Sequence, residues 1–182
     1  LLEKASGKKG VKAAIVNAGK PLPMLAVMDS VNENYNIRLA SLDDVPEIFL
    51  LIKELADYER LLDQVIATEE LLEETLFGEN SNVEVLLAYD ENHILGFALY
   101  FRSFSTFLGR PGIYLEDLFV REFARGKGIG KALLQRIAKS TLEMGGGRLE
   151  WSVLDWNQPA ISFYKKMGAV PLDEWTTFRL TG

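Results

Sequence analysis

The pattern of apolar and polar residues becomes regular near residue 36. From there, short runs with a two-residue period alternate with longer stretches whose apolar positions recur every three or four residues. The short runs predict strands at 36–40, 83–89, 94–104, 112–120, 148–155 and 174–180. The longer stretches predict helices at 41–60, 68–77, 130–145 and 158–168. This order predicts a mixed α/β sheet with one strand–glycine loop–helix crossover in its middle.

Capping residues support the predicted helices. Ser41 and Thr68 stand before the first two, where a side-chain hydroxyl can accept a hydrogen bond from the first turn. Gly145 and Gly168 end the later two, as glycine commonly does at the end of a helix. The helix boundaries therefore rest on two independent signals.

Residues 1–35 show no sustained period. They carry five lysines against three acids and contain scattered Gly, Pro and Asn. We expect this segment to be an N-terminal extension of unassigned role (a tag, a linker or an upstream segment), and residues 36–182 to form the folded domain. A transit peptide is disfavoured because the segment has no arginine and only two serines.

Composition excludes several classes of chemistry. The absence of cysteine excludes disulfides, thiolate metal sites and a cysteine nucleophile. The single histidine, His93, lies in a polar break between two strand runs, so no metal site is expected. No apolar run approaches the roughly 20 residues that span a bilayer, and we expect no membrane role. The net charge of −6 favours a cationic partner over nucleic acid. The lack of cysteine suits a cytoplasmic protein, with organellar targeting left open.

A glycine-rich run, "RGKGIG", joins the strand at 112–120 to the next helix. A helix N-terminus offers unpaired N–H groups and a positive dipole, and glycine lets a ligand approach the backbone closely. Arg125, Lys127 and Lys131 add positive charge. The spacing fits neither a P-loop nor a dinucleotide-binding loop. The run predicts an anion site, and a glycine turn without a ligand is the alternative.

Two adjacent acids, Glu116 and Asp117, lie within the apolar strand "YLEDLFV". Adjacent residues on a regular strand face opposite sides, so both can line one cleft only if the strand bulges. Acids beside core residues usually have a partner or a function. The alternative is a solvated pair of acids.

The stretch "V-x(4)-R-G-x-G-I-G-x-x-L-L" from Val120 to Leu134 resembles the acetyl-CoA-binding motif of the GNAT superfamily of N-acetyltransferases. "IKELADYER", "YLEDLFV", "VLDWNQPAISFYKKMGA" and "LDEW" together resemble the spermidine/spermine (diamine) acetyltransferase family. The "VLDWNQ" version is nearest to members that act on thialysine and other small diamines. The resemblance covers about residues 36 to 182. It implies the GNAT fold: a mostly antiparallel sheet, flanked by helices and splayed between the strands at 112–120 and 148–155.

The resemblance implies transfer of an acetyl group from acetyl-CoA to a primary amine of a small diamine, polyamine or thialysine-like substrate, by direct attack in a ternary complex. It also implies a homodimer. Two alternatives stay open: acetylation of another amine (an amino acid, a peptide N-terminus or an aminoglycoside), and a non-catalytic acyl-CoA sensor.

Roles for individual residues also follow from the resemblance. Tyr164 would be the general acid for the departing thiolate, although composition alone would make it a core aromatic. Glu116 would accept the amine proton, directly or through water, with Asp117 supporting it. Expected substrate contacts are Tyr58, Glu59, Glu116, Asp117, Trp156 and Glu174. Expected cofactor contacts are Leu118, Phe119, Val120, Arg125, Gly126, Lys127, Gly128, Ile129, Gly130, Lys131, Asn157, Ala160 and Phe163.

Overall fold

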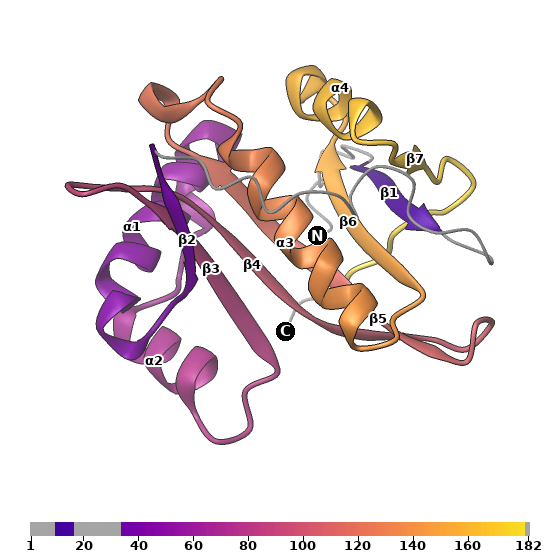
Figure 1. The fold of residues 1–182 in the computed structure, drawn as a ribbon, viewed down its shortest axis with the longest axis horizontal. Helices are drawn as coiled ribbons and strands as arrows, with labels where there is room; N and C mark the ends of the chain where they lie inside the picture. Colours follow the sequence, from indigo (N-terminus) through magenta and orange to yellow (C-terminus); the bar gives the residue numbers. More distant parts are fainter. Residues whose placement is uncertain (1–9, 17–33, 181–182) are drawn as a thin grey trace, which may run out of the picture.

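The fold is built on one sheet of seven strands. The computed structural model describes residues 10–16 and 34–180. The strands are β1 (Gly10–Val16), β2 (Asn36–Leu39), β3 (Val83–Tyr89), β4 (Ile94–Ser105), β5 (Arg110–Val120), β6 (Arg148–Leu154) and β7 (Val170–Pro171). Their order is β2-β3-β4-β5-β6-β1-β7, and every neighbouring pair is antiparallel except β5 and β6 (Figure 1). The predicted mixed, mostly antiparallel sheet is confirmed.

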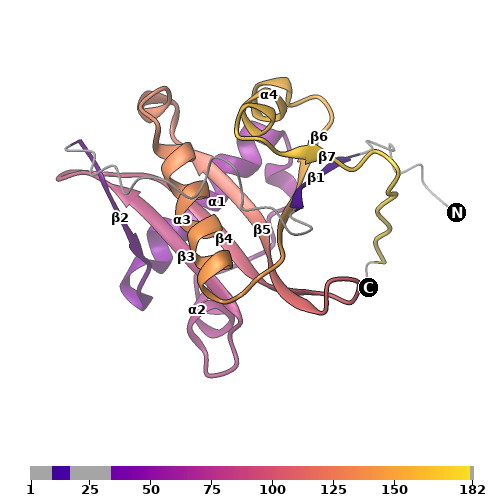
Figure 2. The ribbon, with the colours of Figure 1, turned by 45° about the vertical axis from the view of Figure 1, so that its right-hand side comes forward.

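Helices cover both faces of this sheet. They are α1 (Val45–Glu59), α2 (Glu69–Phe77), α3 (Ile129–Glu143) and α4 (Gln158–Lys166). Apolar residues of α1 and α2 pack on one face of the sheet, and those of α3 and α4 pack on the other. Figure 2 shows α3 in front of the sheet and α1 behind it. Strand β3 shows the alternation directly, because Val85 and Leu87 contribute to the first core and Leu86 and Ala88 to the second. None of the described helices is long and apolar enough to cross a membrane.

Strands β5 and β6 separate part of the way along. They pair only from Ile113 to Leu115, opposite Leu149 to Trp151, while β5 continues to Val120 on the side of β4. On that side the register skips one residue, since Leu99 pairs with Asp117 and Tyr100 pairs with Leu115. Glu116 is therefore the extra residue of a β-bulge. The expected splay and bulge are both present.

Ion pairs hold α1 against the end of β5. The guanidinium of Arg121 lies 2.8 Å from a carboxylate oxygen of Glu47 and 2.8 Å from one of Glu54, and it also donates to the Ile94 carbonyl at 2.8 Å. This arrangement positions the last turn of α1, which carries Tyr58 and Glu59, beside the gap between β5 and β6.

The predicted strand at 174–180 is wrong. These residues have no regular secondary structure, and Trp175, Phe178 and Leu180 are exposed. Instead, β1 pairs with β6 along its whole length, from Gly10 opposite Leu154 to Val16 opposite Arg148. Because β1 lies beside β6 on the side away from β5, residues 174–180 cannot pair with β6 on that side. The sequence pattern did not predict β1. Residues 1–9 and 17–33 lie outside the described residues. The domain limit at 35/36 therefore stays a prediction.

Candidate active site

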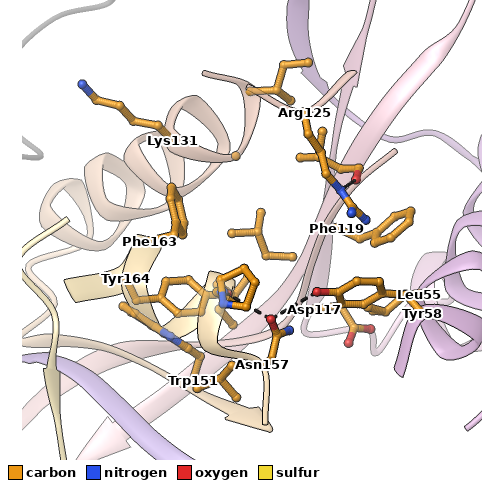
Figure 3. A pocket seen from close by; sticks show the side chains of 18 of the residues that line it. Leu55, Tyr58, Asp117, Phe119, Arg125, Lys131, Trp151, Asn157, Phe163 and Tyr164 are labelled. Carbon is orange, nitrogen blue, oxygen red and sulfur yellow. Dashed lines mark hydrogen bonds between the residues drawn. The ribbon is translucent and has the colours of Figure 1, made fainter. Parts of the chain in front are cut away.

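A cavity of about 510 Å³ opens where β5 and β6 part (Figure 3). Its described lining comes from the end of α1, β5, the start of α3, β6 and α4. The predicted residues in this lining are Tyr58, Glu59, Glu116, Asp117, Leu118, Phe119, Val120, Arg125, Gly126, Gly128, Ile129, Gly130, Lys131, Asn157, Ala160, Phe163 and Tyr164. Segments more than 100 residues apart thus meet in one site.

The glycine loop forms one end of the cavity. Gly126 and Gly128 have φ angles of 78° and 85°, in the left-handed region that favours glycine, and Gly128 is the N-cap residue of α3. A Cβ added at Gly126 would meet nothing within 4 Å, so backbone conformation rather than crowding explains this glycine. The first-turn N–H groups of α3 lie at this end of the cavity, where an anionic group would be stabilised.

Arg125 reaches across from the glycine loop toward α1. Its Nε donates to the Val120 carbonyl at 2.9 Å. Its guanidinium lies 5.0 Å from the ring centroid of Tyr58 and 5.7 Å from that of Phe119, within the range of cation–π attraction. The positive charge of Arg125 is therefore held between the glycine end and the opposite, acidic end of the cavity.

Carboxylates make up the opposite end of the cavity. Asp117 keeps some exposure through the cavity, but the surrounding protein removes most of its solvation. This desolvation, with smaller contributions from the charges of Glu116 and Glu59, raises the pKa of Asp117 to about 7. Desolvation also raises the pKa of Glu59. Glu116, at the bulge, is exposed. Asp117 can therefore exchange a proton near neutral pH.

The start of α4 is tied to α1 through Asn157. Its Oδ1 accepts hydrogen bonds from the Ala160 backbone N–H and from the Tyr58 hydroxyl, each at 3.2 Å. Asn157 is thus both the N-cap residue of α4 and a link to the helix that carries Glu59. Asn157 is buried, and these two hydrogen bonds satisfy its side-chain oxygen.

Tyr164 is buried on the wall formed by α4. Its ring centroid lies 4.8 Å from that of Trp151 and 5.2 Å from that of Phe163. Burial raises the pKa of Tyr164 above its ordinary value, and the negative charges of Asp117 and Glu59 raise it further. The hydroxyl is consequently kept protonated at neutral pH, as a hydrogen-bond donor.

Three predicted site residues lie outside the described lining. Trp156 is exposed and packs against the Tyr58 ring at a centroid distance of 5.9 Å. Lys127 and Glu174 are exposed, Lys127 in the glycine loop and Glu174 beyond β7. Their proposed contacts stay predictions.

Sequence reasoning did not single out Leu55, Leu115 or Trp151, which also line the cavity. The alternation in 148–155 does place Trp151 on a buried face of its strand. It does not reveal that the neighbouring strand departs at that point, because strand separation depends on pairing between distant segments. In the part of the chain that the structure describes, no group of three or more His, Cys, Asp or Glu side chains is arranged so that it could hold a metal ion.

Comparison with known sequences gives a consistent result. Residues 48–169 match the acetyltransferase (GNAT) family. The chain is 41% identical to a thialysine N-epsilon-acetyltransferase of Bos taurus over 157 residues, which cover 80% of this chain and 92% of the relative. It is 36% identical to an L-ornithine N5-acetyltransferase of Arabidopsis thaliana over 191 residues, covering 80% and 84% of the two chains.

Solved structures show the same fold. An integron cassette protein of V. cholerae superposes with a TM-score of 0.69 at 30% sequence identity, covering 82% of this chain and 93% of that one. An aminoglycoside acetyltransferase from an uncultured soil sample gives a TM-score of 0.70 at 22% identity, covering 84% and 99%. At that identity the second likeness concerns the fold alone.

Proposed function

The chain belongs to the acetyltransferase (GNAT) family, and from this premise we propose that it acetylates a primary amine of a small diamine, polyamine or thialysine-like substrate. The observation that carries this proposal is the polarity of the cavity. Helix N–H groups and glycines form one end, while Glu59 and Asp117 line the other. The relatives named for thialysine and L-ornithine, both small molecules with two amino groups, support the same substrate class.

The residues at the glycine end fit acetyl-CoA, which supplies an activated acetyl thioester. The N-terminal amides of α3 would bind its pyrophosphate. Leu118 to Val120 are not paired with β6, so their backbone groups facing the gap are available to the amides of the pantetheine arm. One N–H in this segment would polarise the acyl carbonyl. Ala160 and Phe163 would line the same arm.

The acidic end suits a substrate with two cationic groups. An alkyl ammonium has a pKa of about 10, so a protein group must take its proton before it can act as a nucleophile. The position of Asp117 in the cavity and its pKa of about 7 support Asp117 as the acceptor. Glu116, expected in this role from the family resemblance, is the second candidate and would act through water. Glu59 would bind the distal ammonium.

Tyr164 would donate a proton to the departing CoA thiolate. Its protonated hydroxyl lies on the cavity wall and is influenced by the charges of Asp117 and Glu59. Direct attack within a ternary complex requires both substrates to be bound together, and the two ends of one continuous cavity allow this. The homodimer and the cytoplasmic location stay predictions.

The first test is CoA release measured in parallel with spermidine, thialysine, L-ornithine, a monoamine, an aminoglycoside and a peptide with a free N-terminus. We expect turnover of the small diamines and polyamines to exceed that of the monoamine and the peptide. Preferred turnover of the peptide or the aminoglycoside would contradict the proposed substrate class. Tight acetyl-CoA binding with no turnover of any amine would instead indicate an acyl-CoA sensor.

Glu59→Gln tests the proposed site of the distal ammonium. Loss of a charge-assisted hydrogen bond should raise KM for diamines about 10-fold and leave KM for monoamines nearly unchanged. Asp57→Asn is the matched control, because it removes an exposed charge from the same turn of α1 outside the described lining. Equal increases in KM for diamines and monoamines would contradict the assignment.

A further inference from the structure

One residue that lines the cavity has a buried side-chain hydrogen-bond donor without an acceptor. Three buried side-chain polar atoms in the described residues lack a hydrogen-bond partner: Ser103 Oγ, Arg148 Nε and Trp151 Nε1. Arg148 Nε lies 2.7 Å from Glu150 Oε2 and is ion-paired. Of the three residues, Trp151 alone lines the cavity. A buried donor without an acceptor is unfavourable, so Trp151 calls for an explanation.

Trp151 lies at the point where the two strands part. It is 1% exposed and pairs with Leu115 in the last β5–β6 pair of the register. Its ring packs against Tyr164, the proposed general acid, at a centroid distance of 4.8 Å (Figure 3). The negative charges of Asp117 and Glu59 in turn help to raise the pKa of Tyr164. The indole therefore adjoins the part of the cavity where the acyl donor and the amine would meet.

The chemistry of the indole limits what it can bind. Its N–H donates a hydrogen bond and has no lone pair to accept one. An alkyl ammonium is also a donor only, so the ammonium groups of the substrate cannot satisfy Trp151. The oxygen and sulfur atoms at the thioester end of an acyl-CoA are acceptors and would be brought to this wall by the pantetheine arm.

We propose that Trp151 donates a hydrogen bond from Nε1 to the thioester end of bound acyl-CoA. This inference rests on the proposed function, because it requires acyl-CoA in the cavity. The indole keeps its proton throughout. Its role is to bind and orient the acceptor beside Tyr164, and proton transfer remains with the tyrosine hydroxyl.

The indole N–H resonances of the ¹⁵N-labelled chain provide a direct test. The chain has three tryptophans, and Trp156→Phe and Trp175→Phe, at exposed positions, identify the Trp151 signal by elimination. On addition of acetyl-CoA, the Trp151 signal should move downfield and its exchange with solvent should slow. Adenosine 3′-phosphate 5′-diphosphate, which has the pyrophosphate of CoA but no pantetheine arm, should leave the signal in place.

Two results would overturn the proposal. One is a Trp151 signal that stays in place with acetyl-CoA while the amides of Gly128 and Gly130 move, which leaves the proposed function intact. The other is an equal movement with adenosine 3′-phosphate 5′-diphosphate, which would indicate an indirect effect. If neither the amides nor the indole responds to acetyl-CoA, the proposed function fails as well.

Binding affinity gives a second measurement. Trp151→Phe removes the N–H and retains an aromatic ring, and it should weaken acetyl-CoA binding about 5-fold, as expected for one hydrogen bond. Affinity for adenosine 3′-phosphate 5′-diphosphate should not change. Trp175→Phe, at an exposed position outside the described lining, is the control. Unchanged acetyl-CoA affinity in a folded Trp151→Phe chain would contradict the proposal, and if that chain does not fold, the resonance experiment decides.

Discussion

At the residue scale, the acids of the cavity influence one another. Asp117 carries a pKa raised to about 7, chiefly because it is desolvated and secondarily because Glu116 and Glu59 are close. An ammonium group bound among these acids would offset their repulsion and lower the pKa of Asp117. Amine binding and release of the Asp117 proton are therefore expected to be coupled, which would ready the carboxylate to accept a proton from the amine.

Tyr164→Phe removes the proposed proton donor with little change in shape. We expect kcat to fall roughly 100-fold, the usual scale for a positioned acid, and the Kd for acetyl-CoA to stay nearly the same. Steady-state kinetics and calorimetry measure these two quantities. Tyr100→Phe is the matched control, because it removes another buried hydroxyl, one that donates to Glu84 rather than lining the cavity. Unchanged turnover in Tyr164→Phe would exclude Tyr164 from the mechanism.

The pH dependence of kcat/KM identifies the proton acceptor. If Asp117 accepts the proton, it must be ionised, so kcat/KM should rise with pH through about 7. Asp117→Asn should abolish this limb of the profile. Glu116→Gln should leave the limb in place. The opposite pattern, with the limb lost only in Glu116→Gln, would assign the role to Glu116.

Stability gives a check on Asp117 that does not depend on activity. The folded pKa of about 7 exceeds the ordinary value of 3.8, so the folded chain binds the proton more strongly than the unfolded chain does. The contribution of Asp117 to stability should therefore fall as pH rises from about 4 to about 7. As pH rises from about 4 to about 7, the free energy of unfolding of the unmodified chain should fall relative to that of Asp117→Asn. Identical pH dependences would mean that the pKa is not raised.

At the element scale, the placement of α1 relative to β5 determines the amine end. Tyr58 and Glu59 belong to the last turn of α1, and Arg121 follows β5 directly along the chain. By binding both Glu47 and Glu54, Arg121 contacts α1 at two points nearly two turns apart. The helix is thereby held in rotation as well as in position, so Glu59 is directed toward the cavity.

Arg121→Gln should loosen this attachment. Because the two glutamates are each about one third exposed, the free energy of unfolding should fall by only about 1–2 kcal/mol. KM for the amine should rise, while the Kd for acetyl-CoA should change less, since the first-turn N–H groups of α3 do not belong to α1. Chemical denaturation and kinetics measure these effects, with Arg110→Gln at the exposed start of β5 as control. A loss of stability with unchanged KM would show that α1 is positioned by other contacts.

At the scale of the whole molecule, the cavity lies where the two cores approach each other. Phe119, Leu55 and Tyr58 belong to the core under α1 and α2, whereas Trp151 and Tyr164 belong to the core under α3 and α4. The two cores lie on opposite faces of the sheet, and residues of both line the cavity at the gap between β5 and β6. Beyond β6, β1 covers an edge that would otherwise present unpaired backbone groups.

Removal of residues 1–33 tests the predicted domain limit while retaining the buried Tyr35. The shortened chain loses β1, so β6 loses seven paired residues and β7 loses its partner. We expect a Tm lower by several degrees. Acetyl-CoA affinity should stay within about 2-fold, since the described lining comes from other elements. A folded shortened chain that no longer binds acetyl-CoA would place the limit of the functional domain earlier in the sequence.

The features that depend on near neighbours along the chain could be predicted from the sequence. The amphipathic period of α3, the glycines whose φ angles are positive, and the contiguous motifs around Val120 to Leu134 and Trp156 to Tyr164 were sufficient for the family and the general architecture. These features are local because helix periodicity and loop conformation are properties of short segments.

Strand pairing could not be predicted in this way, because β1 lies beside β6 and residues 174–180 form no strand. Only the structure separated exposed Glu116 from desolvated Asp117, and left Trp151 without an acceptor beside Tyr164. The physical reason is common to all three. Strand pairing, solvation and hydrogen-bond satisfaction depend on atoms contributed by distant segments, which a linear pattern does not bring together.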